Sequence, residues 1–336
     1  MACVVARQDL RAPVVFALWT LGVAACYFAA GRLGLLRELV VEGAVVTPIW
    51  PPTGVALAAL LILGLRSSLG IALGALFVVM SITTPQPQSL VVIAGNTAAP
   101  VCGYLLLRRR RFRTDLARLR DGLTLVFLGA FAAMLISSTT GAVLLLAEGK
   151  LPADSFWTVW LAWWVGDAMG VLIVTPLLLL LHRIHTPVRW SRWKEAAVLT
   201  VVTAGLVPLA TQTSASLLFI VYPLLIWAAL RFQLAGSMVC ALFASVMATI
   251  AATDRTGPFA DLTRTEVMIN LLAFNGAAAL TALLLSSMIS EQQSLRRSVE
   301  RACQELVEVL EHLTAGEGAS NRAPPEEEGR RRGEDV

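Results

Sequence analysis

Charged side chains are scarce in this sequence. Only 15% of its 336 residues are Asp, Glu, Lys or Arg, whereas soluble domains carry about 25%. Hydrophobic residues make up 57%, and the mean hydropathy is +0.71. A water-soluble fold has too small a core to hide this much apolar surface, but a lipid bilayer accepts it. The composition therefore predicts an integral membrane protein.

Cysteine and histidine are also few, and their positions argue against metal sites. The five cysteines show no CxxC spacing, which excludes a disulfide framework and a zinc site. None of the three histidines, His182, His185 and His312, falls in the middle of an apolar run, so a buried bis-histidine haem is excluded. HExxH, GxSxG and Walker motifs are absent. We expect no enzyme activity, no metal and no cofactor.

Apolar stretches of membrane-spanning length recur along the whole chain. An all-α polytopic bundle of about ten spans is predicted, or eight if the shorter stretches are re-entrant or merged. Arg7 and Arg11 precede the first stretch as in a secretory leader, but its length and the stretches after it favour an uncleaved span. The stretches are 13–31, 48–65, 67–83, 89–107, 122–147, 156–181, 196–211, 217–231, 234–252 and 266–288.

The basic residues are unevenly distributed between alternate loops. Four at one side, Arg37, Lys150, Arg255 and Arg264, each have an acidic residue nearby. The positive-inside rule then places both termini in the cytoplasm of a bacterial inner membrane. Because these residues act as topology signals, the net charge of +4 does not indicate a nucleic-acid partner. The opposite, predominantly basic side carries Arg7, Arg11, Arg66, Arg108–Arg111, Arg113, Arg118, Arg120, Arg183, Arg189, Arg192, Lys194, Arg231, Arg296 and Arg297.

After Ser290 the pattern changes from a continuous apolar run to a heptad spacing. Apolar residues follow a 4-3-4-3-4 spacing, which predicts a short coiled-coil helix and a homodimer. A helix that simply continues the last span is compatible with this interpretation. Beyond Gly316, Gly, Pro, Glu and Arg dominate, which predicts disorder. The seam residues are Leu295, Val299, Ala302, Leu306, Val309 and Leu313.

Two polar motifs interrupt the early spans. Trp50-Pro51-Pro52-Thr53-Gly54 opens the second, where prolines cost no helical hydrogen bonds and Trp50 suits a membrane interface. A capped helix entrance explains each residue separately but not the cluster as a whole. In Gly95-Asn96-Thr97, Asn96 bonds a neighbouring helix or contacts a ligand, and the two alternatives are equally supported.

Trp163-Trp164-Val165-Gly166-Asp167 is the most informative stretch. Asp167 falls toward the middle of a span, where a charge costs at least about 2.5 kcal/mol, so a partner in the bundle is expected. Gly166 and Gly170 allow a second helix to approach closely, and Pro176 follows. The candidate partners of Asp167 are Asn96, Asn270, Asn275 and Arg231.

Two later motifs have simple structural explanations. Arg231, in Trp227-Ala228-Ala229-Leu230-Arg231-Phe232, can extend to the cytoplasmic interface. Gly257-Pro258-Phe259 is expected in an extracytoplasmic turn.

Taken in order, these motifs resemble the first of the bacterial membrane-associated sensor (MASE) domains. The resemblance covers roughly residues 13–290 and includes Leu105-Leu106-Leu107-Arg108-Arg109, Thr175-Pro176, and Trp227 with Arg231-Phe232.

The resemblance implies a sensory module fused to a histidine kinase or a GGDEF diguanylate cyclase. Only about 46 residues follow the last span, with no GGDEF or EAL string, and His312 lacks a phosphoacceptor context. We therefore expect the output in another polypeptide, or in a part missing from this chain. The expected organisation is a cytoplasmic N-terminus (1–12), a membrane sensor domain (13–289), a coiled-coil signalling helix (290–315) and a charged tail (316–336).

Three functions compete. A sensor would use Asp167 and Asn96 as its polar core, with Trp50, Thr53, Trp163, Trp164 and Arg231 as further candidates. A transporter of a small molecule or ion would use the same intramembrane Asp167 and proline-broken helices, although no inverted repeat is evident. A scaffold would recruit a partner through its charged tail.

Overall fold

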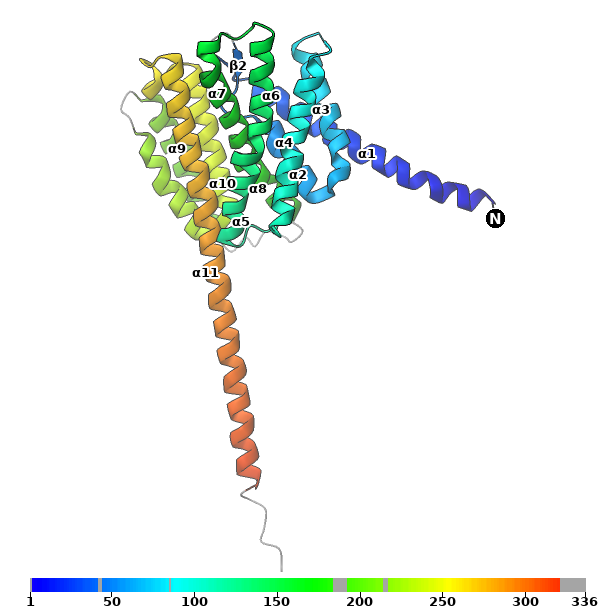
Figure 1. Cartoon of the computed structure of the whole chain (residues 1–336). Helices are drawn as coiled ribbons and strands as arrows, with labels where there is room; N and C mark the ends of the chain where they lie inside the picture. Colours follow the sequence, from blue (N-terminus) through cyan, green and yellow to red (C-terminus); the bar gives the residue numbers. More distant parts are fainter. Residues whose placement is uncertain (1, 42–43, 85, 184–191, 214–216, 321–336) are drawn as a thin grey trace, which may run out of the picture. The chain divides into compact units, whose positions relative to one another are not determined.

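The protein is a polytopic helical bundle, as predicted. The computed structural model describes residues 2–41, 44–84, 86–183, 192–213 and 217–320. Among these residues, eight helices are long and apolar enough to cross a membrane. Figure 1 shows most of these helices next to one another in the bundle. The helices are α1 (Ala2–Leu35), α2 (Pro51–Leu63), α3 (Ser68–Ile82), α4 (Ser89–Arg109), α5 (Leu119–Thr124), α6 (Ala133–Ala147), α7 (Phe156–Met169), α8 (Thr175–Arg183), α9 (Trp193–Gln212), α10 (Val221–Thr253) and α11 (Arg264–Ser320).

Two of the spans contain a wider, π-helical stretch. Leu125–Ala132 joins α5 to α6, and Gly170–Val174 joins α7 to α8. Each joined set forms one continuous crossing, Leu119–Ala147 and Ala153–Arg183. Such stretches displace the backbone hydrogen bonds by one residue and frequently occur at functional sites.

The difference between ten and eight spans lies in α2 and α10. The segment predicted at 48–65 is a helix of only 13 residues, too short to cross a bilayer by itself. The segments predicted at 217–231 and 234–252 both lie within α10, which is interrupted at Gln233 (φ 52°, ψ −140°).

Helix α10 folds back on itself at Gln233. A Cβ atom on Gly236 would lie 3.3 Å from the carbonyl oxygen of Ala228, although residues eight apart in a straight helix are separated by about 12 Å along the axis. The C-terminal end of α10 lies near the end of α9, because a Cβ on Gly257 would be 2.3 Å from the Thr211 carbonyl. The start of α10, at Val221, follows the last residue of α9, Gln212, by only nine positions. The predicted segments 217–231 and 234–252 are therefore two helical segments of α10 that run in different directions from Gln233.

A short β-hairpin follows α1. Strand β1 (Leu39–Val41) pairs antiparallel with β2 (Ala44–Val46), with Leu39 opposite Val46. The sequence analysis predicted an all-α bundle and therefore did not predict this hairpin. Residues 47–50 then lead into the bundle, where they contact α7.

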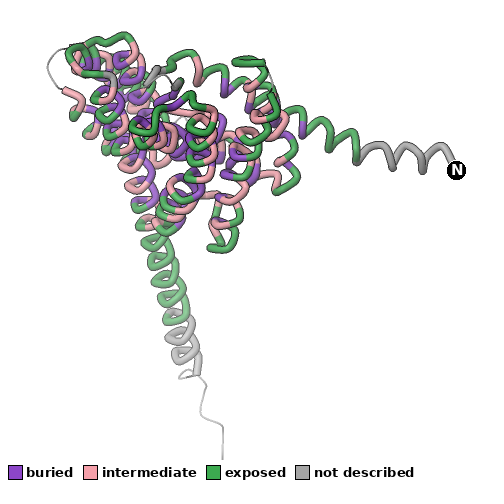
Figure 2. The backbone as a smooth tube through the Cα atoms, turned by 45° about the horizontal axis from the view of Figure 1, so that its top comes forward, coloured by how far each residue is buried: buried purple, intermediate pink, exposed green. Residues whose placement is uncertain are grey.

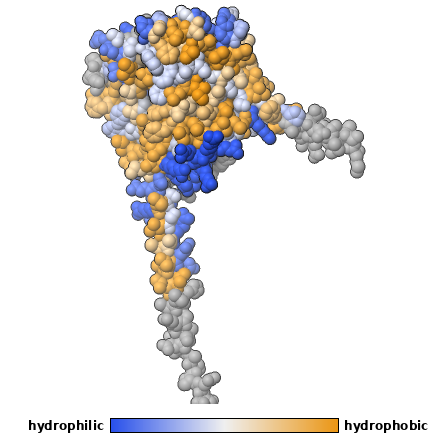
Figure 3. Space-filling model, viewed as in Figure 1, coloured by the Kyte–Doolittle hydropathy of each residue, from blue (hydrophilic) through white to orange (hydrophobic). Residues whose placement is uncertain are grey.

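The buried core lies between the helices, and the outer surface is apolar. Buried residues occupy the inner faces of the bundle (Figure 2), whereas large apolar side chains such as Leu18, Trp157 and Val201 are exposed. Figure 3 shows the hydrophobic outer surface, with hydrophilic residues gathered near α5. We call this end, marked by Arg108–Arg111, Arg113, Arg118 and Arg120, the arginine-rich end.

The chain divides into two compact units, Met1–Ser290 and Glu291–Val336, and α11 contributes to both. In the second unit Leu295, Val299, Leu306 and Val309 are 54–63% exposed. The side chain of Leu313 lies outside the described residues, so the coiled coil stays a prediction. Residues 316–320 of the predicted tail extend α11, and the remainder lies outside the described residues.

Candidate functional site

The carboxyl group of Asp167 is fully buried in the bundle. The residue is on α7 and is 0% exposed. Its Oδ2 accepts a short hydrogen bond from the hydroxyl of Ser137, on α6, while its Oδ1 has no hydrogen-bond partner among the described residues. A charge this far from water costs about 2.5–3.5 kcal/mol. One serine hydroxyl therefore accounts for all the side-chain hydrogen bonding seen at this carboxyl.

The first turn of α2 is fastened to the backbone around Asp167. The hydroxyl of Thr53 lies 2.8 Å from the Trp50 carbonyl and 2.9 Å from the Asp167 carbonyl. The amide of Trp50 donates to the Gly166 carbonyl at 2.8 Å. Pro51 begins the helix, where no intrahelical partner for its nitrogen is needed. We call Trp50, Thr53, Ser137, Gly166 and Asp167 the Asp167 cluster.

Glycines allow the two backbones to approach this closely. A Cβ on Gly166 would lie 2.3 Å from the Thr47 carbonyl, and one on Gly170 would lie 1.9 Å from the Trp50 carbonyl. A Cβ on Gly54, in turn, would lie 2.2 Å from the Gly170 carbonyl. Any side chain at these positions would separate α2 from α7.

Thr175 and Pro176 continue the same contact into α8. The hydroxyl of Thr175 donates to the carbonyl of Gly54 at 3.1 Å, and both Thr175 and Pro176 are buried. Pro52 of α2 is also buried, but it lies near α1, where a Cβ on Gly31 would be 3.6 Å from its ring. The contact between α2 and α7–α8 thus extends over at least two helical turns.

The cluster lies at about half the depth of the crossing. Asp167 lies eleven positions after Phe156, the first residue of α7, which corresponds to about 17 Å of helix. Because the bilayer core is about 30 Å thick, α2 begins near the middle of the crossing, and the π-helical stretch Gly170–Val174 follows Asp167 closely. Non-helical backbone at this depth occurs where protein surrounds it or where it lines a cavity.

The two tryptophans of the motif contact different neighbours. The indole nitrogen of Trp164 donates to the carbonyl of Phe131 at 2.8 Å, within the π-helical stretch Leu125–Ala132. Its ring stacks on Trp160 with centroids 5.9 Å apart. The Trp163 ring covers Gly141, where a Cβ would lie 2.6 Å from it.

Asn96 is close to this region in the fold but makes no hydrogen bond among the described residues. Its neighbour Gly95 packs against Thr140 of α6, where a Cβ would lie 2.1 Å from the threonine hydroxyl. Thr140 follows Ser137 by about one turn, and its hydroxyl is bonded to the Ser137 carbonyl at 2.9 Å. Asn96 itself is half-buried.

None of the four expected partners bonds to Asp167. Arg231 is exposed and pairs with Glu195 at 3.4 Å. Asn270 is exposed, whereas Asn275 is fully buried with neither side-chain atom bonded among the described residues. Sequence reasoning missed Ser137 because serine is common in membrane helices and carries no signal of its own.

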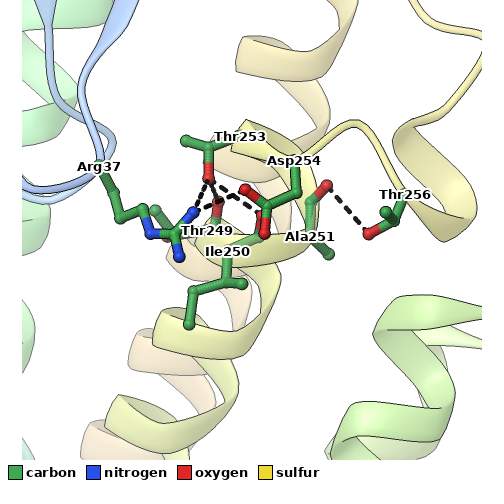
Figure 4. A network of polar contacts seen from close by, with 7 residues as sticks. All are labelled: Arg37, Thr249, Ile250, Ala251, Thr253, Asp254 and Thr256. Atoms are coloured by element: carbon green, nitrogen blue, oxygen red, sulfur yellow. Dashed lines mark hydrogen bonds and ion pairs between the residues drawn. The ribbon is translucent and has the colours of Figure 1, made fainter.

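The Gly257-Pro258-Phe259 motif lies in a short 3₁₀ turn between α10 and α11. Phe259 is 0% exposed and belongs to the main core. Nearby, Arg37 forms an ion pair of 2.6 Å with Asp254 and lies 3.3 Å from the Thr253 hydroxyl (Figure 4). This network connects the segment after α1 to the end of α10.

The described residues contain no group of three or more His, Cys, Asp or Glu side chains placed to hold a metal ion. The Asp167 cluster contains one carboxyl group, two hydroxyls, one indole and backbone groups. It is suited to hydrogen bonding and to a change in helix contacts.

A comparison with protein families finds a match to the family model MASE1 over residues 19–293. The matched region includes the whole Asp167 cluster. No curated protein and no solved structure matches the chain.

Proposed function

Because the chain belongs to the MASE1 family, we propose that it is a sensory input protein of a bacterial inner membrane. The family is a membrane sensory domain of signalling proteins. In our proposal, a stimulus from the bilayer or the extracytoplasmic side changes the bundle, and α11 relays the change to a separate signalling partner. That partner would be a histidine kinase or a diguanylate cyclase.

The continuity of α11 is the observation that carries this proposal. One helix of 57 residues, Arg264–Ser320, extends from the membrane-spanning unit into the unit that begins at Glu291. Its exposed apolar side chains at Leu295, Val299, Leu306 and Val309 follow the spacing of a coiled-coil seam. A second copy or a partner helix would cover this seam.

The Asp167 cluster is the proposed input site. Helix α2 begins near the middle of the crossing and is held there by a few hydrogen bonds. It lies beside the carboxyl group of Asp167, of which only one oxygen has a described hydrogen-bond partner. In our proposal this start of α2 can adopt two arrangements. A stimulus that favours one arrangement shifts the population between them. Asn96, Trp163 and Trp164 border the cluster in this proposal. Arg231 would act separately, through its ion pair with Glu195.

We propose that the arginine-rich end faces the cytoplasm, with both termini on that side, in accord with the positive-inside rule. The pair of Arg37 and Asp254 would then lie on the extracytoplasmic side.

Cysteine crosslinking along α11 in native membranes tests the seam. In a chain lacking other cysteines, Val309→Cys should give disulfide-linked dimers, whereas Gln304→Cys, on the opposite face of the heptad, should not. Equal crosslinking at both positions would contradict a defined seam.

A gentle-detergent purification tests the relay. Mass spectrometry should identify a kinase or cyclase that co-purifies with the chain, is lost with Leu306→Glu and is retained with the matched control Gln304→Glu. Retention with both variants would contradict the proposal that the seam recruits the partner.

A transporter is the alternative function. It is favoured by the position of Asp167 beside the start of α2, which lies near the middle of the crossing. Transporters use discontinuous helices and intramembrane carboxyl groups to bind substrates and ions. Flux measured with the purified protein in liposomes, abolished by Asp167→Asn and retained with Ser138→Ala, would support transport. Absence of flux for ions and for small metabolites would exclude it.

A further inference from the structure

Helices α1 and α3 pack tightly over part of their length and then separate. Glycines of α3 lie against α1: a Cβ on Gly74 would be 2.6 Å from Tyr27, and one on Gly70 would be 2.6 Å from the Thr20 carbonyl. Gly70 is the last such glycine toward the start of α3. Preceding it, the chain turns through Gly64 and Leu65–Ser67.

A cavity of about 520 Å³ occupies the space where the helices separate. One wall is the outer part of α1, where Phe16 and Trp19 are 41% and 57% exposed. The opposite wall is the turn between α2 and α3. The lining residues are Val15, Phe16, Trp19, Thr20, Val23, Leu63, Arg66 and Ser67.

Two polar groups of this cavity have no partner among the residues whose side chains the structure describes. Thr20 is 6% exposed, and its hydroxyl makes no hydrogen bond there. Arg66 makes no ion pair or hydrogen bond there either. By contrast, the Ser67 hydroxyl donates to the Gly64 carbonyl at 2.8 Å. The Thr20 hydroxyl is shielded from the cavity, so the cavity offers one cation, Arg66, to a ligand that is otherwise apolar.

We propose that this cavity binds an anionic phospholipid of the leaflet at the arginine-rich end. Arg66 lies at this end because α3 and α4 are consecutive antiparallel helices, and α4 ends at Arg109. The guanidinium group contacts the lipid phosphate by charge-assisted hydrogen bonds. One acyl chain lies along the exposed faces of Phe16 and Trp19.

Native mass spectrometry of the full chain, released from detergent micelles, tests this proposal with dioleoyl phosphatidylglycerol as the probe. The unsubstituted chain should bind it more tightly than dioleoyl phosphatidylcholine. Arg66→Gln should weaken binding of the anionic lipid about tenfold, the loss expected for a charge-assisted contact. The control Arg109→Gln, which removes an exposed arginine at the same end, should leave binding unchanged.

A second variant fills the cavity without altering Arg66. Val15 is 49% exposed, so Val15→Trp adds bulk without disturbing the core and should reduce binding of both lipids. Inorganic phosphate should not compete, because the acyl chain supplies much of the contact.

Three results would overturn the proposal. The first is equal binding of the anionic lipid by the Arg66→Gln and Arg109→Gln variants, and the second is displacement of that lipid by inorganic phosphate. The third is a dimer of the unsubstituted chain that Val15→Trp dissociates without reducing lipid binding. The last would identify this face as a contact between two copies of the chain.

Discussion

The hydroxyl of Thr53 lies 2.9 Å from the backbone carbonyl of Asp167, a residue 114 positions away in the sequence. The same hydroxyl lies 2.8 Å from the Trp50 carbonyl, within its own helix turn. One side chain therefore holds the start of α2 in position and fixes it to α7. Since a single hydroxyl proton serves two acceptors, this contact is a place where the bundle can change its hydrogen bonding at small cost.

Replacing Thr53 by valine keeps the shape of the side chain and removes both contacts. We expect Thr53→Val to lower the free energy of unfolding by about 1–3 kcal/mol, because buried carbonyls lose their donor. Thr53→Ser keeps the hydroxyl and is the matched control. Thermal unfolding of the detergent-purified protein measures the difference, and equal transition temperatures would show that the hydroxyl does not fasten α2.

Ser137 and Ser138 are adjacent, buried and equal in size, but only Ser137 bonds to Asp167. Within the part of the chain that the structure describes, the hydroxyl of Ser138 bonds only to carbonyls of its own helix, at 3.2 Å. We expect Ser137→Ala to destabilise the protein by about 1–3 kcal/mol, because it leaves the carboxyl without its donor. Ser138→Ala should cost less than about 1 kcal/mol.

The same thermal unfolding assay compares these two alanine variants. A smaller loss for Ser137→Ala than for Ser138→Ala would contradict the assignment of Ser137 as the partner of Asp167.

The contact between α2 and α7–α8 requires glycine at position 170. In Gly170→Ala the added Cβ would lie 1.9 Å from the Trp50 carbonyl, so the helices must separate, and we expect little folded protein in the membrane. A Cβ on Gly205, in α9, would instead meet no neighbouring atom within 4 Å. Gly205→Ala should therefore be tolerated or stabilising by up to about 1 kcal/mol.

Fluorescence-detected size-exclusion chromatography of the two glycine variants gives the yield of folded protein directly. A normal, monodisperse yield for Gly170→Ala would show that the backbones of α2 and α7–α8 need not touch.

Hydropathy predicted the class of fold because it measures which segments avoid water. The separate stretches 217–231 and 234–252 placed a boundary at Gln233, where α10 reverses, although neither glycine nor proline lies at that position. The hairpin Leu39–Val46 is too short to carry a clear period, so it was missed.

Within the site, Asp167 could be identified from sequence because a carboxyl group in an apolar run is costly. Its partner could not be identified. The hydroxyl of Ser137 also lies 3.0 Å from the Met134 carbonyl of its own helix, so nothing in the local sequence shows that it is needed elsewhere. The contact of Thr53 with Asp167 depends on the alignment of two distant helices, which one sequence does not encode in any local pattern.

The ion pair of Arg37 and Asp254 connects segments 217 positions apart at 2.6 Å, and both side chains are nearly half exposed. Exposed pairs contribute about 0.2–1 kcal/mol because water and salt screen them. A double-mutant cycle of Arg37→Ala and Asp254→Ala, followed by thermal unfolding at low salt, should give a coupling energy in this range. At about 1 M salt, where charges are screened within about 3 Å, the coupling should fall towards zero. A coupling well above this range that persists at high salt would mean that the pair is shielded from water in the membrane. The segment after α1 would then be fixed to the end of α10 firmly enough to transmit a movement of α1 across this end of the bundle.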